Sequence, residues 1–262
     1  MPGTRAAYVE TNVQPNVQPD DNSKAMENSD MHYAPPLMRR LAAFSAFRVA
    51  AFFPAVFLLA ALCSSFSLYA TAQMAPPAEG KEYLRLKNPQ PVETGKNIEV
   101  IEFFSYGCPH CGEFEPILQN WLKTKPADVQ FRRVPVMFQD RWVPLARIYY
   151  TLEALGEEAR LSPEVFVAIH SKGQPLWEDK KFFDWAASQG LDRKKVEDMY
   201  NSFAIGGKVN RAKMAAQAYQ IQSVPLVIVD GKYMSNRVPS HAAIPPLIDT
   251  LVAKARAERP KS

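Results

Sequence analysis

The feature that most constrains this chain is a Cys-Pro-His-Cys sequence at residues 108–111, between a strand pattern and a helix pattern. Residues 97–106 are rich in β-branched and aromatic side chains, which predicts a buried strand. Apolar residues then recur at helical spacing over residues 114–122. Cys108 is therefore expected at a helix N-terminus, where free backbone N–H groups and the helix dipole stabilise a negatively charged sulfur.

The other residues of this motif also favour reactive thiol chemistry. Pro109 has no N–H to lose and suits the first turn of a helix. His110 can add a positive charge or a hydrogen-bond donor beside the Cys108 sulfur. Cys111 follows one turn later on the same side, so the two cysteines can close a small disulfide ring. A stabilised thiolate favours the reduced form and is a good leaving group, which predicts a protein that donates its disulfide.

Other uses of a C-x-x-C pair fit this sequence less well. A zinc site needs further ligands, and the chain has only three cysteines and four widely spaced histidines, of which we expect His170 and His241 at the surface. A c-type haem site needs a histidine directly after the second cysteine, where this chain has Gly112. A structural disulfide across so short a loop restrains little chain. We therefore expect redox function without a metal or an organic cofactor.

The remaining patterns within residues 73–262 predict an α/β fold. A second strand is expected at 129–137, and the later elements are a helix at 208–221, a strand at 225–229, a hairpin turn at Asp230-Gly231 and a last helix at 242–259. Between these two groups lie four predicted helices, at 141–155, 162–171, 180–189 and 192–203.

Without the four helices, the order is βαβ followed by αββα, which is the thioredoxin arrangement. We therefore predict a thioredoxin fold formed by residues 73–138 and 205–262. The helical block at 139–204 is then an inserted domain.

The first 72 residues divide into two segments. Residues 1–37 are polar and rich in Pro, Asn and Gln, so we expect disorder there. Residues 38–72 have the pattern of a signal peptide: a basic start, an apolar run at 49–63 and small residues up to Ala72, after which cleavage is expected. An uncleaved membrane anchor is the alternative. Because a leader begins at an N-terminus, we expect translation to start at Met38, downstream of the first segment.

Composition and charge exclude several classes of protein. Hydrophobic residues make up 47% and charged residues 22% of the chain, which is ordinary globular usage. This excludes collagen-like, coiled-coil and wholly disordered proteins. The net charge is only +4, without a basic run, so we do not expect a nucleic acid as partner.

Residues 102–111, with the sequence Glu-Phe-Phe-Ser-Tyr-Gly-Cys-Pro-His-Cys, resemble the active-site segment of the DsbA family, and Phe114-Glu115 extend the likeness. Members of that family are periplasmic thiol:disulfide oxidases with a thioredoxin fold. Val224-Pro225, before a late apolar strand, resembles the family's cis-proline site. The resemblance covers nearly all of residues 73–262, and a Pro-His dipeptide between the cysteines is specific among thioredoxin-like proteins.

The resemblance implies a role for each matching residue. Cys108 would be the nucleophile that forms mixed disulfides with substrate, and Cys111 the buried resolving cysteine. The bond between Val224 and Pro225 would be cis, and its loop would present backbone groups to a substrate peptide.

Acidic residues and glycines near the motif leave some questions open. Glu102 would accept or relay a proton near the buried cysteine, or it is a strand-end acid that reaches water. Glu115 matches a family acid, but we expect it on a solvent-exposed helix face. Pro116 should kink the helix. Gly107 and Gly112 stand where the family often has bulkier aromatic residues, which leaves the shape of the substrate groove open.

We therefore predict an exported thiol:disulfide oxidoreductase that donates the Cys108–Cys111 disulfide to newly translocated proteins in the periplasm. Its expected partners are unfolded or folding exported proteins with free thiols. The resemblance implies a DsbB-type quinone-linked membrane protein as electron acceptor, and we expect a monomer. The alternatives are a reductase or isomerase on the same fold and a peptide-binding chaperone whose disulfide is structural.

Overall fold

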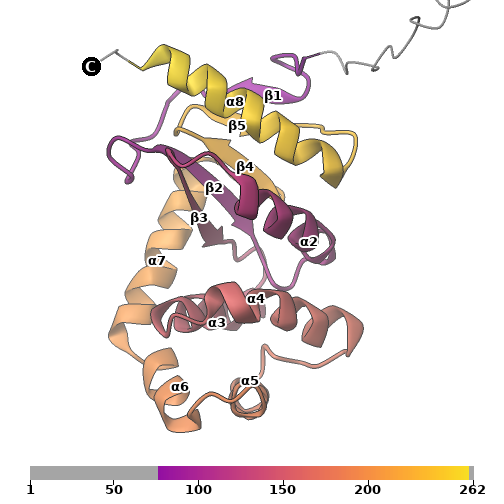
Figure 1. The fold of residues 1–262 in the computed structure, drawn as a ribbon. Coiled ribbons are helices and arrows are strands. Elements are labelled where there is room, and N and C mark those ends of the chain that lie inside the picture. The colour runs from indigo at the N-terminus through magenta and orange to yellow at the C-terminus, as the bar shows by residue number, and fades with distance from the viewer. Residues whose placement is uncertain (1–75, 260–262) are drawn as a thin grey trace, which may run out of the picture. The chain divides into compact units, whose positions relative to one another are not determined.

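The computed structural model describes residues 76–259 (Figure 1). The predicted disordered segment 1–37 and the predicted signal peptide 38–72 lie outside these residues. Within 76–259, none of the helices combines the length and the apolar character needed to cross a membrane.

A five-stranded mixed sheet with the strand order β1-β5-β4-β2-β3 forms the centre of the fold. β2 pairs with β3 in parallel and with β4 antiparallel, so it lies between them. All residues of β2 are buried, as expected for an apolar strand that is covered on both faces. The strands are β1 (Tyr83–Arg85), β2 (Ile98–Phe104), β3 (Val129–Pro135), β4 (Leu226–Val229) and β5 (Tyr233–Ser235).

Helices cover both faces of this sheet. They are α2 (Pro109–Thr124), α3 (Trp142–Ala154), α4 (Glu158–Phe166), α5 (Asp179–Ser188), α6 (Arg193–Tyr200), α7 (Phe203–Ala218) and α8 (Ile244–Glu258). Successive side chains of a strand point to opposite faces. Val100 of β2 accordingly joins an apolar cluster with α2 and α8, whereas Ile101 and Phe103 join one with α3 and α7. The parallel β2–β3 pair is connected through α2, as a crossover requires.

The helical stretches predicted between the second and third strands are present as α3 to α6. α4 continues directly into a π-helical turn at Val167–Ser171. In Figure 1 these helices form a layer of their own below the sheet, and α7 runs from this layer back to the sheet. The arrangement agrees with a thioredoxin fold that carries an additional helical block, and it places the start of α2 between the sheet and that block.

Candidate active site

Cys108 is the N-cap residue of α2, and Pro109 occupies the first turn, as the sequence predicts. The backbone N–H groups of Cys111 and Gly112 donate to the Cys108 carbonyl oxygen at 3.1 and 3.2 Å. Both cysteines are free thiols. The Cys108 residue retains 7% exposure and Cys111 retains none. Of the two sulfurs, only that of Cys108 is therefore open to attack from outside.

The two thiols differ strongly in acidity. Hydrogen bonding to the Cys111 side chain lowers the pKa of Cys108 to about 6, and the backbone N–H groups of Cys111 and His110 act in the same direction against partial burial. The positive charge of His110 adds a smaller effect. Burial raises the pKa of Cys111 far above its ordinary value. Cys108 is thus the thiol that ionises near neutral pH.

The Val224–Pro225 segment faces Cys108. Its peptide bond is cis, as the resemblance implies. The Cys108 thiol donates a hydrogen bond to the Val224 carbonyl oxygen, with an Sγ–O distance of 3.5 Å. Pro225 lines a groove of about 350 Å³ together with residues that include Asn236 and Val238. The dipeptide therefore contacts the Cys108 sulfur through residue 224 and lines the groove through residue 225.

A buried charge cluster lies behind the cysteines. Glu102 is only 1% exposed, so the alternative of a strand-end acid that reaches water is wrong. Glu115, expected on a solvent-exposed helix face, is also buried, and that expectation is wrong as well. Arg133 Nε donates to Glu102 Oε2 at 2.8 Å, and its Nη2 donates to Glu115. Arg133 Nη1 donates to Glu158 Oε1 at 2.9 Å.

Arg133 was not predicted as a site residue, although the sequence contains a signal for it. Arg132-Arg133 interrupts the apolar pattern of β3, and an arginine there needs a partner if it is buried. The partner follows from strand register, because Arg133 is paired with Glu102 in the parallel β2–β3 ladder. The carboxylates of Glu102, Glu115 and Glu158 raise the pKa of Arg133 despite its burial, so the guanidinium stays charged.

Glu102 is electrostatically coupled to the buried thiol. Burial raises the pKa of Glu102 to about 7, the charge of Arg133 opposes this rise, and the charge of Glu115 adds to it. The negative charge of Glu102 in turn contributes to the raised pKa of Cys111. A carboxyl group with a pKa near the working pH can both give and accept a proton.

The two glycines that flank the motif are covered by aromatic side chains of the helical block. A Cβ added to Gly107 would overlap Trp142 Nε1 and lie 2.8 Å from Trp142 Cδ1. A Cβ added to Gly112 would lie 3.3 Å from Phe166 Cδ1. Trp142 and Phe166 thus occupy the space that larger side chains at these positions would need.

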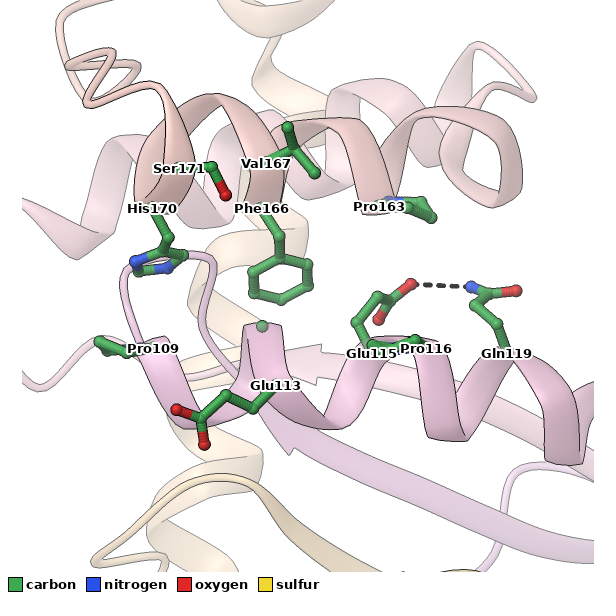
Figure 2. Close-up of a pocket in the computed structure, with 11 residues that line it drawn as sticks. Pro109, Glu113, Glu115, Pro116, Gln119, Pro163, Phe166, Val167, His170 and Ser171 are labelled. Atoms are coloured by element: carbon green, nitrogen blue, oxygen red, sulfur yellow. Dashed lines mark hydrogen bonds between the residues drawn. The ribbon is translucent and has the colours of Figure 1, made fainter. Parts of the chain in front are cut away.

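A second groove, of about 460 Å³, lies between α2 and α4 with its π-helical turn. Phe166 and His170 reach into it from α4 and its π-helical turn, toward the first turn of α2 (Figure 2). His170 Nε2 lies within hydrogen-bond distance, 2.8 Å, of the Tyr106 carbonyl oxygen.

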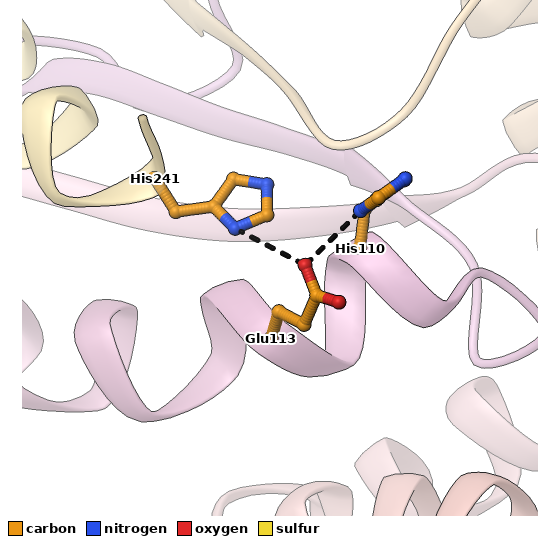
Figure 3. A group of neighbouring side chains, drawn as sticks. All are labelled: His110, Glu113 and His241. Atoms are coloured by element: carbon orange, nitrogen blue, oxygen red, sulfur yellow. Dashed lines mark hydrogen bonds and ion pairs between the residues drawn. The ribbon is translucent and has the colours of Figure 1, made fainter. Parts of the chain in front are cut away.

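Near the start of α2, His110 lies beside Glu113 and His241 (Figure 3). His110 Nδ1 is 3.0 Å from Glu113 Oε2, and this hydrogen bond raises the pKa of His110. From the sequence, His241 was expected at the surface, and no metal was expected. The structure nevertheless brings three side chains of metal-ligating type together, one of them from the active-site motif.

A family model described as DSBA-like thioredoxin domain matches residues 99–243. The chain belongs to the DsbA family. The protein named thiol:disulfide interchange protein DsbA from Burkholderia cepacia is 41% identical over 194 residues, which cover 71% of this chain and 90% of that protein. The protein of the same name from Pseudomonas aeruginosa PAO1 is 41% identical over 177 residues, 67% of this chain and 84% of the relative.

Solved structures of DsbA proteins agree with this membership. The crystal structure of Pseudomonas aeruginosa DsbA is similar with a TM-score of 0.67 at 40% identity, over 69% of this chain and 95% of that one. The oxidoreductase DsbA from Xylella fastidiosa is similar with a TM-score of 0.65 at 29% identity, over 69% of this chain and 98% of that one. This DsbA-family chain is a thiol:disulfide oxidoreductase with a thioredoxin-like fold.

Proposed function

We propose that the chain is an oxidase that donates a Cys108–Cys111 disulfide to thiols of other proteins. The observation that carries this proposal is the contrast between the two thiols: the pKa of Cys108 is lowered to about 6, whereas that of buried Cys111 is raised. A stabilised thiolate favours the reduced enzyme over its disulfide, so the disulfide is a strong oxidant.

The proposed reaction consists of two thiol–disulfide exchanges. A substrate thiolate attacks Sγ of Cys108, the bond to Cys111 breaks, and Cys111 leaves and takes up a proton. A second substrate thiolate then attacks the substrate sulfur of the mixed disulfide and expels Cys108 as a thiolate. The substrate gains a disulfide and loses two electrons, and the enzyme retains them as the Cys108 thiolate and the Cys111 thiol.

Glu102 is proposed to supply the proton that Cys111 takes up and to accept it again on reoxidation. A pKa of about 7 keeps this carboxyl group partly protonated near neutral pH. Arg133 holds it in place through the hydrogen bond from Nε.

Substrate binding is proposed at Val224 and Pro225. Since the Cys108 sulfur contacts the Val224 carbonyl group and Pro225 lines the adjacent groove, a peptide in that groove would bring its own thiol to Cys108. His110 and Pro109 would act from the first turn of α2 on the stability of the thiolate.

The proposal extends to location and partners. The signal-peptide pattern at 38–72 and the family both favour a periplasmic enzyme whose substrates are unfolded or folding exported proteins with free thiols. Repeated turnover needs an electron acceptor, which we take to be a DsbB-type quinone-linked membrane protein. The enzyme would act as a monomer and without a cofactor.

The redox equilibrium of the protein with glutathione tests this function. We expect a potential more oxidising than about −180 mV, the value of protein disulfide isomerase, and far from the value of about −270 mV of thioredoxin. A potential near that of thioredoxin would make the protein a reductase and overturn the proposal.

A double variant, Cys108→Ser with Cys111→Ser, separates catalysis from peptide binding. We expect it to lose all oxidation of a reduced two-cysteine peptide. If the variant still promoted correct folding of a reduced substrate protein as well as the parent, the chain would be a chaperone with a structural disulfide.

A further inference from the structure

Three side chains that can bind a metal meet near the start of α2 (Figure 3). His110 Nδ1 lies 3.0 Å from Glu113 Oε2, and His241 Nδ1 lies 3.7 Å from the same oxygen. One ligand atom of each residue lies within 4.8 Å of the others. A tetrahedral zinc ion with bonds of about 2.0–2.2 Å holds its ligand atoms about 3.4 Å apart. Two of the three separations are already close to this value.

The fold holds the three residues on two elements that touch. His110 and Glu113 lie three residues apart near the start of α2 and therefore share one face of the helix. His241 begins a short 3-10 helix, His241–Ala243, directly before α8. Its ring lies 6.0 Å from the ring of Phe114, which is fully buried, and 5.9 Å from the ring of His110. Packing on Phe114 thus keeps His241 beside the other two.

The donor atoms are those that zinc prefers. Two imidazoles and one carboxylate form a three-residue set that occurs in proteins with an open fourth zinc position, whereas Ca²⁺ and Mg²⁺ prefer oxygen ligands alone. The side chains of His110 and Glu113 are exposed, at 70% and 61%, and that of His241 is half-buried, so an ion has access. We propose that His110, Glu113 and His241 bind a zinc ion whose fourth position faces solvent.

Two effects oppose binding. The positive end of the α2 dipole disfavours a cation at this position, and the charge of Glu113 acts in the other direction. Protons compete with a metal ion for the imidazole nitrogens, so zinc should bind more weakly in acid.

A bound ion would also occupy His110, which follows Cys108 by two residues. Zinc should then slow disulfide transfer reversibly, a consequence that rests on the proposed oxidase function. Binding itself does not depend on that function, so the two are tested separately.

The binding test is a zinc titration of the protein in its disulfide form, in which neither sulfur can act as a thiolate ligand, by competition with a chromophoric chelator. We expect one zinc ion per chain at this site, and no competition from Mg²⁺. His241→Asn and Glu113→Gln should each weaken binding at least tenfold, which is about 1.4 kcal/mol. His170→Asn is the matched control, because it removes a histidine on the other side of α2 and should leave the affinity unchanged.

Two results would overturn the zinc site. The first is equal affinity in the parent and in His241→Asn, with both folded by circular dichroism. The second is binding to the reduced protein alone, which would assign the metal to Cys108 and Cys111. The redox potential of the parent protein against glutathione is measured without zinc, so failure of the zinc site is distinguishable from failure of the oxidase function.

Discussion

At the scale of single residues, the ionisation of Cys108 links the redox state of the protein to its stability. Hydrogen bonding to the Cys111 side chain lowers the pKa of Cys108 to about 6, whereas an unfolded cysteine has a pKa of about 8.5. A lowered pKa stabilises the fold above the unfolded pKa, and this stabilisation is lost as the pH falls through the folded pKa. The disulfide form carries no such charge.

We therefore expect the unfolding free energy of the reduced protein, measured relative to that of the disulfide form, to increase by about 1 kcal/mol as the pH rises from about 5 to about 7. Urea unfolding of both forms across this range measures the difference. His110→Ala removes a positive charge beside the thiolate and should make the gain smaller. A stability difference that does not change with pH would contradict a lowered pKa for Cys108.

Gly107 and Gly112 should respond differently to the same small substitution. Gly107→Ala places a methyl group against the buried ring of Trp142 and 3.0 Å from Leu145 Cδ1, and overpacking of this kind costs about 1–3 kcal/mol. Gly112→Ala brings its methyl group to 3.3 Å from Phe166 Cδ1, which a small shift of the ring can relieve. We expect a large loss of unfolding free energy for the first variant and a small one for the second. Equal losses would show that Trp142 moves freely.

The site residues at 108–111 could be predicted from the sequence, because they are consecutive and helix geometry alone determines their relative positions. The role of Glu102 depends on Arg133, which lies 31 positions away in the sequence, so it could not be predicted in the same way. The β2–β3 register pairs this arginine with Glu102, and the arginine also binds Glu158 of the helical block; a local pattern contains neither contact. His241 joins His110 for the same kind of reason, through packing between α2 and a distant 3-10 helix.

At the scale of elements, the order from β2 to α8 was predictable, but several helix boundaries were not. α4, for example, begins at Glu158 and not at residue 162. The pattern predicted helices at 192–203 and 208–221, whereas α6 ends at Tyr200 and α7 begins at Phe203. Gly206 and Gly207 are poor helix formers and argue locally against the observed start. Burial of Ile205 and capping by Ser202 outweigh that preference.

Ser202 is therefore expected to stabilise the start of α7. Its side-chain oxygen accepts a hydrogen bond from the Ile205 N–H at 3.3 Å, and loss of such a cap costs about 1 kcal/mol. Ser202→Ala should lower the unfolding free energy by about this amount, and Ser202→Asp, which keeps an acceptor, should retain it. Thermal or urea unfolding measures both. Equal destabilisation by the two variants would show that the hydroxyl does not cap the helix.

At the scale of the whole molecule, one buried cation connects three parts of the fold. Arg133 of β3 binds carboxylates from β2, from α2 and from α4, and so connects the sheet with α2 and with the helical block. The connection continues from Glu158, which accepts a hydrogen bond from Ser162, whose hydroxyl lies 2.5 Å from the Tyr106 hydroxyl, near the motif. A change in the helical block can therefore alter the charge environment of Glu102 without touching either cysteine.

Arg133→Met tests this connection, because it leaves three carboxylates with no cation among them. Loss of one partner of a buried ion pair costs about 3–5 kcal/mol, and Arg133→Lys, which keeps the charge, should lose less. Burial raises the pKa of Glu102 to about 7, and the charge of Arg133 limits that rise. Because the folded pKa lies above the unfolded pKa, the free energy of unfolding falls as the pH rises through the folded pKa. Without Arg133 the loss should be steeper between about pH 5 and pH 8. Urea unfolding at several pH values measures the slope, and a deficit that is constant with pH would mean that Arg133 acts through packing alone.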